Sequence, residues 1–139
     1  MSEDAPPFEF ASSILRAQRS SMMLGVELLE FEEGRASLAL QTRDELRQQH
    51  GFIHGGIVAY LADCALSFAG GSVLGDSITV EFKINYMRPA RGDGRLIAIG
   101  EVVGHGRTQA TVRVDVFLEG EAGERVRCAA AQGTIQRAG

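Results

Sequence analysis

The chain has 139 residues, of which 45% are hydrophobic and 23% are charged, a composition typical of a folded globular protein rather than a disordered one. Its formal net charge of −4 leaves no global positive field to hold a polyphosphate backbone, so we do not expect a nucleic acid partner. The length favours a single domain over 1–139, with the acidic, proline-containing residues 1–7 expected to form a disordered tail.

The pattern of apolar residues predicts two helices and six strands. Helical spacing indicates the helices, whereas alternation between glycine-rich turns indicates the strands. In chain order the predicted elements are a helix at 8–20, strands at 26–31 and 36–40, a helix at 57–69, and strands at 78–86, 95–103, 108–118 and 125–135. The short connections predict that consecutive strands are antiparallel neighbours.

The segment 57–69 is apolar on nearly every side, which is typical of a buried helix. As a helix it would span about 20 Å, less than the ~30 Å core of a bilayer, so we expect it inside the protein and not in a membrane. Because one helix must then serve the whole sheet, the pattern predicts an α+β protein in which a curved antiparallel sheet wraps around one long central helix.

Cysteine usage and the N-terminal residues favour a cytoplasmic protein. The two cysteines, Cys64 and Cys128, are too few for a disulfide framework and lack the spacing of a zinc site. Cys64, at an apolar position of the helix, is interpreted as a buried structural thiol. The N-terminal residues do not have the basic-then-apolar order of a signal peptide.

One acidic residue, Asp63, lies in the middle of the apolar helix, with few polar neighbours one turn away. Burying an unpaired carboxylate costs on the order of several kcal/mol, so a partner or a function should compensate for it. Asp63 is therefore either a structural residue bonded to a backbone group or an arginine, or a reactive carboxylate in a dry cleft.

The motif His54-Gly55-Gly56 leads into the same helix. Two glycines at a helix start let a ligand approach the backbone and leave N–H groups of the first turn unpaired. Such a terminus stabilises a developing oxyanion. Alone, the motif would indicate a flexible turn with a surface histidine; together with Asp63 it predicts an acyl-transfer site, in which a carboxylate attacks or activates water.

The spacing of these groups predicts an assembly. Gly55 and Asp63 are eight residues apart, which is about 12 Å along a helix. One reacting carbonyl needs both groups within roughly 3 Å of its own atoms. Two antiparallel copies of the helix about a two-fold axis would bring the N-terminus of each beside the middle of the other. We therefore predict an obligate homodimer with two composite sites, alone or as a dimer of dimers.

Four motifs stand in this order along the chain: QQHGFIHGG at 48–56, LAD at 61–63, TVE at 79–81 and NYMRPA at 85–90. From about Phe8 to Ile135 the chain resembles the hotdog-fold acyl-CoA thioesterases, in particular the branch that resembles the phenylacetate-pathway thioesterase. The resemblance implies the hotdog fold and hydrolysis of an acyl-CoA to the free acid and CoA, with no cofactor. Phenylacetyl or hydroxylated aryl groups are the acyl groups that it suggests.

The resemblance also implies roles for individual residues. Asp63 would be the nucleophile or general base, and the Gly55 N–H of the other subunit would polarise the thioester carbonyl. His54 would position the loop and the carbonyl. Gln48, where family members often have Asn, and Thr79 would orient the attacking water. Strict alternation in 78–86, however, places Thr79 on the polar face of its strand with Glu81.

Further residues are candidates for binding the substrate. Gly56 follows Gly55 at the start of the helix, and a pocket near Tyr60 could take aryl or medium-length aliphatic acyl groups, which would enter between the two helices. Arg88, Arg91 and Arg107 are candidates for the CoA phosphates, because arginine forms bidentate phosphate contacts. A solvated loop face explains these arginines equally well.

One other function remains open from the sequence, and a second lacks the motif that it would need. The same fold could serve as a non-catalytic acyl-CoA binding or sensing module, with Asp63 merely hydrogen-bonded. Hydration of an enoyl thioester would rely on a His–acid motif that this sequence does not contain.

No metal is expected, because Gly51 interrupts the helix that would have to present both His50 and His54.

Overall fold

The computed structural model describes residues 7–139, so the tail expected at 1–7 lies outside the described residues except for Pro7, where the first helix begins. The helices are α1 (Pro7–Ala17), α2 (Arg19–Leu24), the 3-10 helix η1 (Asp44–Leu46) and α3 (Gly55–Leu74). The strands are β1 (Glu27–Glu32), β2 (Arg35–Gln41), β3 (Ser77–Tyr86), β4 (Arg95–His105), β5 (Gln109–Glu119) and β6 (Arg125–Arg137). All the predicted strands are present, with small differences at their ends.

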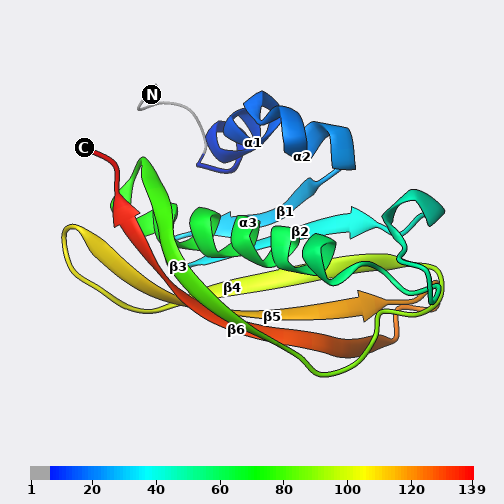
Figure 1. Ribbon diagram of the computed structural model, residues 1–139. Coiled ribbons are helices and arrows are strands. Elements are labelled where there is room, and N and C mark those ends of the chain that lie inside the picture. The colour runs from blue at the N-terminus through cyan, green and yellow to red at the C-terminus, as the bar shows by residue number, and fades with distance from the viewer. Residues whose placement is uncertain (1–6) are drawn as a thin grey trace.

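The strands form one antiparallel sheet in the order β1-β2-β4-β5-β6-β3, which curves around α3 (Figure 1). The predicted architecture is confirmed. The expectation that consecutive strands are neighbours is wrong for β3 and β4, because β3 pairs with β6 and β4 pairs with β2 and β5. The connection 87–94 can span about 26 Å, enough to pass the ends of two intervening strands at about 4.8 Å per strand spacing.

The helix predicted at 8–20 is divided into α1 and α2, which lie over the side of α3 that faces away from the sheet (Figure 1). Gln18, between them, has an extended backbone with φ −84° and ψ 105°. The break turns the buried Ser21 toward α3, where its hydroxyl lies 2.7 Å from the Tyr60 hydroxyl. A tertiary contact rather than local periodicity therefore decides where α1 ends.

The central helix α3 is longer than the predicted segment and forms the core of the protein. It is long and apolar enough to cross a membrane, but it packs against all the strands of the sheet and is the buried core helix of the structure. Helix and sheet touch directly at Gly100 of β4, where a Cβ would lie 2.6 Å from the carbonyl oxygen of Ala65. Only glycine permits so close an approach.

Strand β3 contains a β-bulge that changes which side chains face α3. The register with β6 shifts between Thr79 and Glu81, and a bulge reverses the alternation of side chains beyond it. Ile78 and Val80 are consequently 58% and 51% exposed. Thr79 faces the helix instead, so the prediction that placed it on the polar face with Glu81 is wrong.

Candidate active site

The N-terminus of α3 has a single free N–H group. The His54 side chain caps the helix by accepting a hydrogen bond from Gly56 N at 2.8 Å. The backbone carbonyl of His54 accepts from Ile57 N at 2.9 Å and Val58 N at 3.3 Å. Among residues 7–139, the Gly55 N–H has no hydrogen-bond partner. The first turn of a helix has backbone N–H groups without partners inside the helix, and of these the N–H of Gly55 is the one available to a ligand.

Tyr86, at the end of β3, fixes the orientation of this turn. Its hydroxyl donates to the Gly55 carbonyl oxygen at 2.8 Å, while His54 holds the Gly56 N–H of the same peptide group. That peptide plane is therefore held at both ends. A Cβ at Gly55 would lie 3.2 Å from the Tyr86 ring, which makes glycine the best fit. The sequence reasoning did not single out Tyr86, because alternation marked it only as one more apolar position.

The carboxylate of Asp63 is half-buried and points toward β3. Thr79 Oγ1 donates to Asp63 Oδ1 at 2.6 Å, and this is the one hydrogen bond to the carboxylate within the described part of the chain. The bond fixes the side chain and leaves Oδ2 free to act on a substrate or a water.

The adjacent Cys64 is inert, because burial raises the pKa of its thiol to about 12 and a protonated thiol is a poor nucleophile.

A cavity of about 210 Å³ opens at the free N–H; it is called the Gly55 pocket here. It is lined by Phe52, Ile53, Gly55, Val58, Tyr86, Arg88, Pro89, Ala90 and Cys128. Its walls are mostly apolar, as is usual for pockets that bury the organic part of a ligand. Arg88 is the one cationic side chain that lines it.

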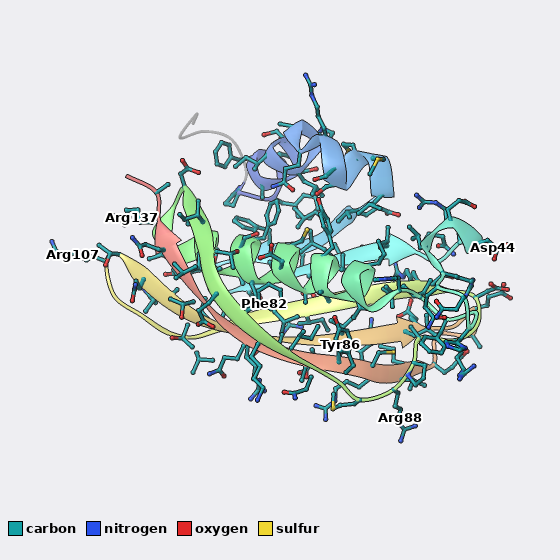
Figure 2. The ribbon with its side chains drawn as sticks, viewed as in Figure 1. Asp44, Phe82, Tyr86, Arg88, Arg107 and Arg137 are labelled. Atoms are coloured by element: carbon teal, nitrogen blue, oxygen red, sulfur yellow. The ribbon has the colours of Figure 1, made fainter. Side chains whose placement is uncertain are left out.

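The predicted phosphate-binding arginines do not gather in one place. Arg88 follows β3, whereas Arg107 lies in the turn between β4 and β5, at the opposite end of the sheet (Figure 2). Arg91 packs over the ring of Phe52, with its guanidinium carbon 4.9 Å from the ring centroid. Arg88 and Arg91 therefore flank the Gly55 pocket, and Arg107 does not.

Three other predicted site residues are engaged in contacts within the chain. Gln48 Oε1 accepts a hydrogen bond from His50 N at 2.5 Å, which closes the turn before the glycine motif. The hydroxyl of Tyr60 lies 2.6 Å from the hydroxyl of Ser20, so Tyr60 joins α3 to α2. The N–H of Gly56 is occupied by the His54 cap.

The two histidines of the motif have separate positions. His54 caps α3, whereas the ring of His50 stacks on Phe52 with centroids 6.2 Å apart. Within residues 7–139 no three His, Cys, Asp or Glu side chains are grouped so that they could hold a metal ion.

Arg47 is a structural residue of the site that sequence reasoning missed. Its side chain is only 13% exposed and donates to the carbonyl oxygens of Gly51 and Gly92, each at 3.0 Å. It thereby joins the loop before α3 to the turn before β4. An arginine in a polar stretch gives no sequence signal that distinguishes such a buried anchor from a solvated side chain.

The model of the thioesterase superfamily matches residues 50–124 of this chain, which is more than half of its length. The chain belongs to the thioesterase superfamily. Its curved sheet around one long helix is the hotdog fold, as the resemblance of its motifs implied. A thioesterase family protein from Silicibacter pomeroyi has the same fold, with a TM-score of 0.87, 30% identity, and coverage of 94% of this chain and 97% of the other.

Two further proteins are similar to this chain. A mutant form of the phenylacetic acid degradation protein PaaI from Thermus thermophilus is 30% identical, with a TM-score of 0.77 and coverage of 87% of this chain and 100% of the other. A 1,4-dihydroxy-2-naphthoyl-CoA hydrolase from Listeria monocytogenes is 28% identical over 100 residues, which are 70% of this chain and 81% of the other. The predicted class of enzyme, an acyl-CoA thioesterase, is confirmed at this general level.

Proposed function

We propose that this thioesterase hydrolyses an aryl- or medium-chain acyl-CoA to the free acid and CoA. The proposal depends on two groups that are free on one helix: the N–H of Gly55 and Oδ2 of Asp63. A fixed N–H stabilises the oxyanion of a tetrahedral intermediate, and a fixed carboxylate acts as base or nucleophile. The names of the two relatives, which concern a naphthoyl-CoA and phenylacetic acid degradation, support an aryl acyl group.

In the general-base form of the mechanism, Asp63 removes a proton from a water whose oxygen attacks the thioester carbon. The carbonyl oxygen becomes an oxyanion and accepts a hydrogen bond from the Gly55 N–H. When the intermediate collapses, the C–S bond breaks and the departing CoA sulfur takes the proton that Asp63 had removed from the water. Thr79 supports either form, because its hydrogen bond to Oδ1 holds Oδ2 in one direction.

In the nucleophilic form, Oδ2 of Asp63 attacks the carbonyl carbon directly, and the C–S bond breaks to release the CoA thiolate, which takes a proton from solvent. Water then hydrolyses the resulting mixed anhydride. Single turnover in ¹⁸O-labelled water identifies the nucleophilic form if the label is found in the Asp63 carboxylate. Attack of water at the aspartyl carbon of the anhydride would leave the label in the Asp63 carboxylate, whereas the general-base form places it in the product acid from the first turnover.

The site that we propose is shared between two copies of the chain. Within one protomer the two groups are separated by about 12 Å of helix, too far for one carbonyl. An antiparallel partner would place Gly55 of the partner subunit beside Asp63. The exposed apolar Ile78 and Val80 lie on β3, an edge strand of the sheet. An uncovered apolar edge supports pairing with a second copy, and further pairing of dimers into a tetramer is part of the proposal.

Substrate-binding roles follow from the Gly55 pocket. We assign the CoA phosphates to Arg88 and Arg91, which flank that pocket. Arg107 contacts the CoA phosphates only if another protomer of the oligomer brings it to that pocket. His54 acts as the cap that leaves Gly55 N–H free, and Gln48 orients water only if it releases His50 N.

A thiol-release assay tests the proposed activity. The purified chain is offered benzoyl-, phenylacetyl-, naphthoyl-, octanoyl- and acetyl-CoA, beside Asp63→Asn and the control Glu33→Gln, an exposed carboxylate between β1 and β2. We expect Asp63→Asn to lower kcat by about 10²–10⁴-fold, the scale of a positioned base, and Glu33→Gln to leave it unchanged. A loss of tenfold or less would reject the role of Asp63. Binding of acyl-CoA without hydrolysis would indicate a sensing module instead.

A further inference from the structure

A second cavity, of about 330 Å³, lies between α1, the C-terminal half of α3 and the start of β3. It is called the α1 pocket here. Its apolar walls are Phe10, Ala11 and Ile14 of α1 and Phe68 of α3. The protein core does not fill this space, and Ile14 at its edge remains 42% exposed.

The nearest lining residue of the α1 pocket on α3 lies one helical turn from Asp63. Ser67, which lines it, follows Asp63 by four residues on α3, so the two side chains are neighbours on the helix surface. Ser77, which also lines it, precedes Thr79 by two residues on β3 before the bulge, and both side chains are half-buried on the face toward α3. The cavity therefore lies next to the Asp63–Thr79 pair, on the side toward the C-terminal end of α3.

We propose that the α1 pocket receives the acyl group of the substrate and that α1 sets the largest acyl group the enzyme accepts. This inference rests on the proposed thioesterase site. A thioester carbonyl at Asp63 has its CoA on one side and its acyl group on the other. The CoA side is assigned to the Gly55 pocket of the partner subunit. The acyl group then extends along α3 into the α1 pocket, whose lining starts at Ser67, one helical turn beyond Asp63.

The size and chemistry of the α1 pocket define a substrate class. A cavity of about 150 Å³ lined by apolar side chains is enough for benzene, so about 330 Å³ accommodates two fused rings. Gln18, Asp76 and Ser77 add hydrogen-bonding groups to the lining. The pocket thus fits an acyl group of up to two rings, with a polar substituent favoured over a bare hydrocarbon.

The position of α1 is fixed by the contacts of the following helix. The hydroxyl of Tyr60 lies 2.6 Å from that of Ser20 and 2.7 Å from that of Ser21. These contacts tie α2, and with it α1, to α3. Tyr60, predicted to contact substrate, would in this arrangement act on acyl size by holding the wall of the pocket.

Steady-state kinetics test whether α1 limits acyl size. Ile14→Trp adds a bulky side chain at the edge of the pocket, and Met23→Trp, at a residue that is 74% exposed and does not line it, is the control. We expect Ile14→Trp to lower the ratio of kcat/KM for 2-naphthoyl-CoA to that for acetyl-CoA by at least tenfold, whereas Met23→Trp leaves the ratio unchanged. An unchanged ratio in Ile14→Trp would overturn the inference and leave the thioesterase proposal standing.

A binding measurement tests whether the acyl group lies in the α1 pocket, independently of whether the chain hydrolyses thioesters. The chain contains no tryptophan, so Phe10→Trp and the control Met23→Trp each introduce one fluorophore. In an Asp63→Asn background, we expect 2-naphthoyl-CoA to change the emission of the Phe10→Trp protein much more than CoA alone does, with no such difference in the Met23→Trp protein. Equal responses to both ligands in Phe10→Trp would show that the acyl group lies elsewhere, whether or not the chain hydrolyses thioesters.

Discussion

The Gly55 N–H can be removed selectively, because Gly55 is the first residue of α3. Proline is tolerated at that position and lacks an N–H, and the ψ of 134° at His54 lies in the extended range that a residue before proline prefers. We expect Gly55→Pro to lower kcat by about 10²–10³-fold, the scale of one lost oxyanion donor. Gly55→Ala is the matched control, because it adds the same Cβ near Tyr86 but keeps the N–H.

The outcome is measured by thiol release, with circular dichroism to verify that both variants are folded. If Gly55→Pro and Gly55→Ala lose activity equally, crowding against Tyr86 explains the loss and the oxyanion role of the N–H is contradicted.

Single residues were predictable from the sequence where their chemistry did not depend on distant contacts. Asp63 and the glycine motif stand out because an acid in an apolar helix and paired glycines at a helix start are unusual locally. The contact of Thr79 with Asp63 depends on a β-bulge that alternation cannot show. Tyr86 and Arg47 act through the folded chain, so no local signal marks them.

At the scale of elements, contact between α3 and the sheet depends on small residues. Gly100→Ala would place a Cβ 2.6 Å from the backbone oxygen of Ala65, which cannot move aside as a flexible side chain can. We expect this change to lower the free energy of unfolding by about 1–3 kcal/mol, the usual cost of overpacking. Urea denaturation measures the change. Gly104→Ala, also in β4 but with open space around it, should cost much less, and equal losses would contradict the packing argument.

Elements with strong local patterns were predicted well, and those that depend on tertiary contacts were not. The apolar α3 and the strands between glycine-rich turns have clear periodicity. The break at Gln18 reflects the contact of Ser21 with Tyr60, and the place of β3 beside β6 reflects which strand edge was free. Neither is encoded in the spacing of residues along the chain.

At the scale of the whole molecule, the proposed shared site requires that β3 be covered by a second copy. A charge at the exposed Val80 would be desolvated in such an interface. We expect Val80→Lys to shift the protein to monomers in sedimentation velocity and to lower activity by at least 100-fold. The control is Val103→Lys, since Val103 is 63% exposed and lies on β4, away from the edge strand. A Val80→Lys monomer with full activity would show that one chain holds a complete site.

The central claim, that Asp63 of one copy works with Gly55 of the other, is tested most directly by mixed dimers. Asp63→Asn and Gly55→Pro chains with different affinity tags are refolded together, and the dimer that carries both tags is purified. A shared site predicts that each parent is nearly inactive and that the mixed dimer regains about half of the wild-type activity, because one of its two sites combines the intact Asp63 with the intact Gly55. A mixed dimer as inactive as its parents would contradict the claim and place both groups in the same chain.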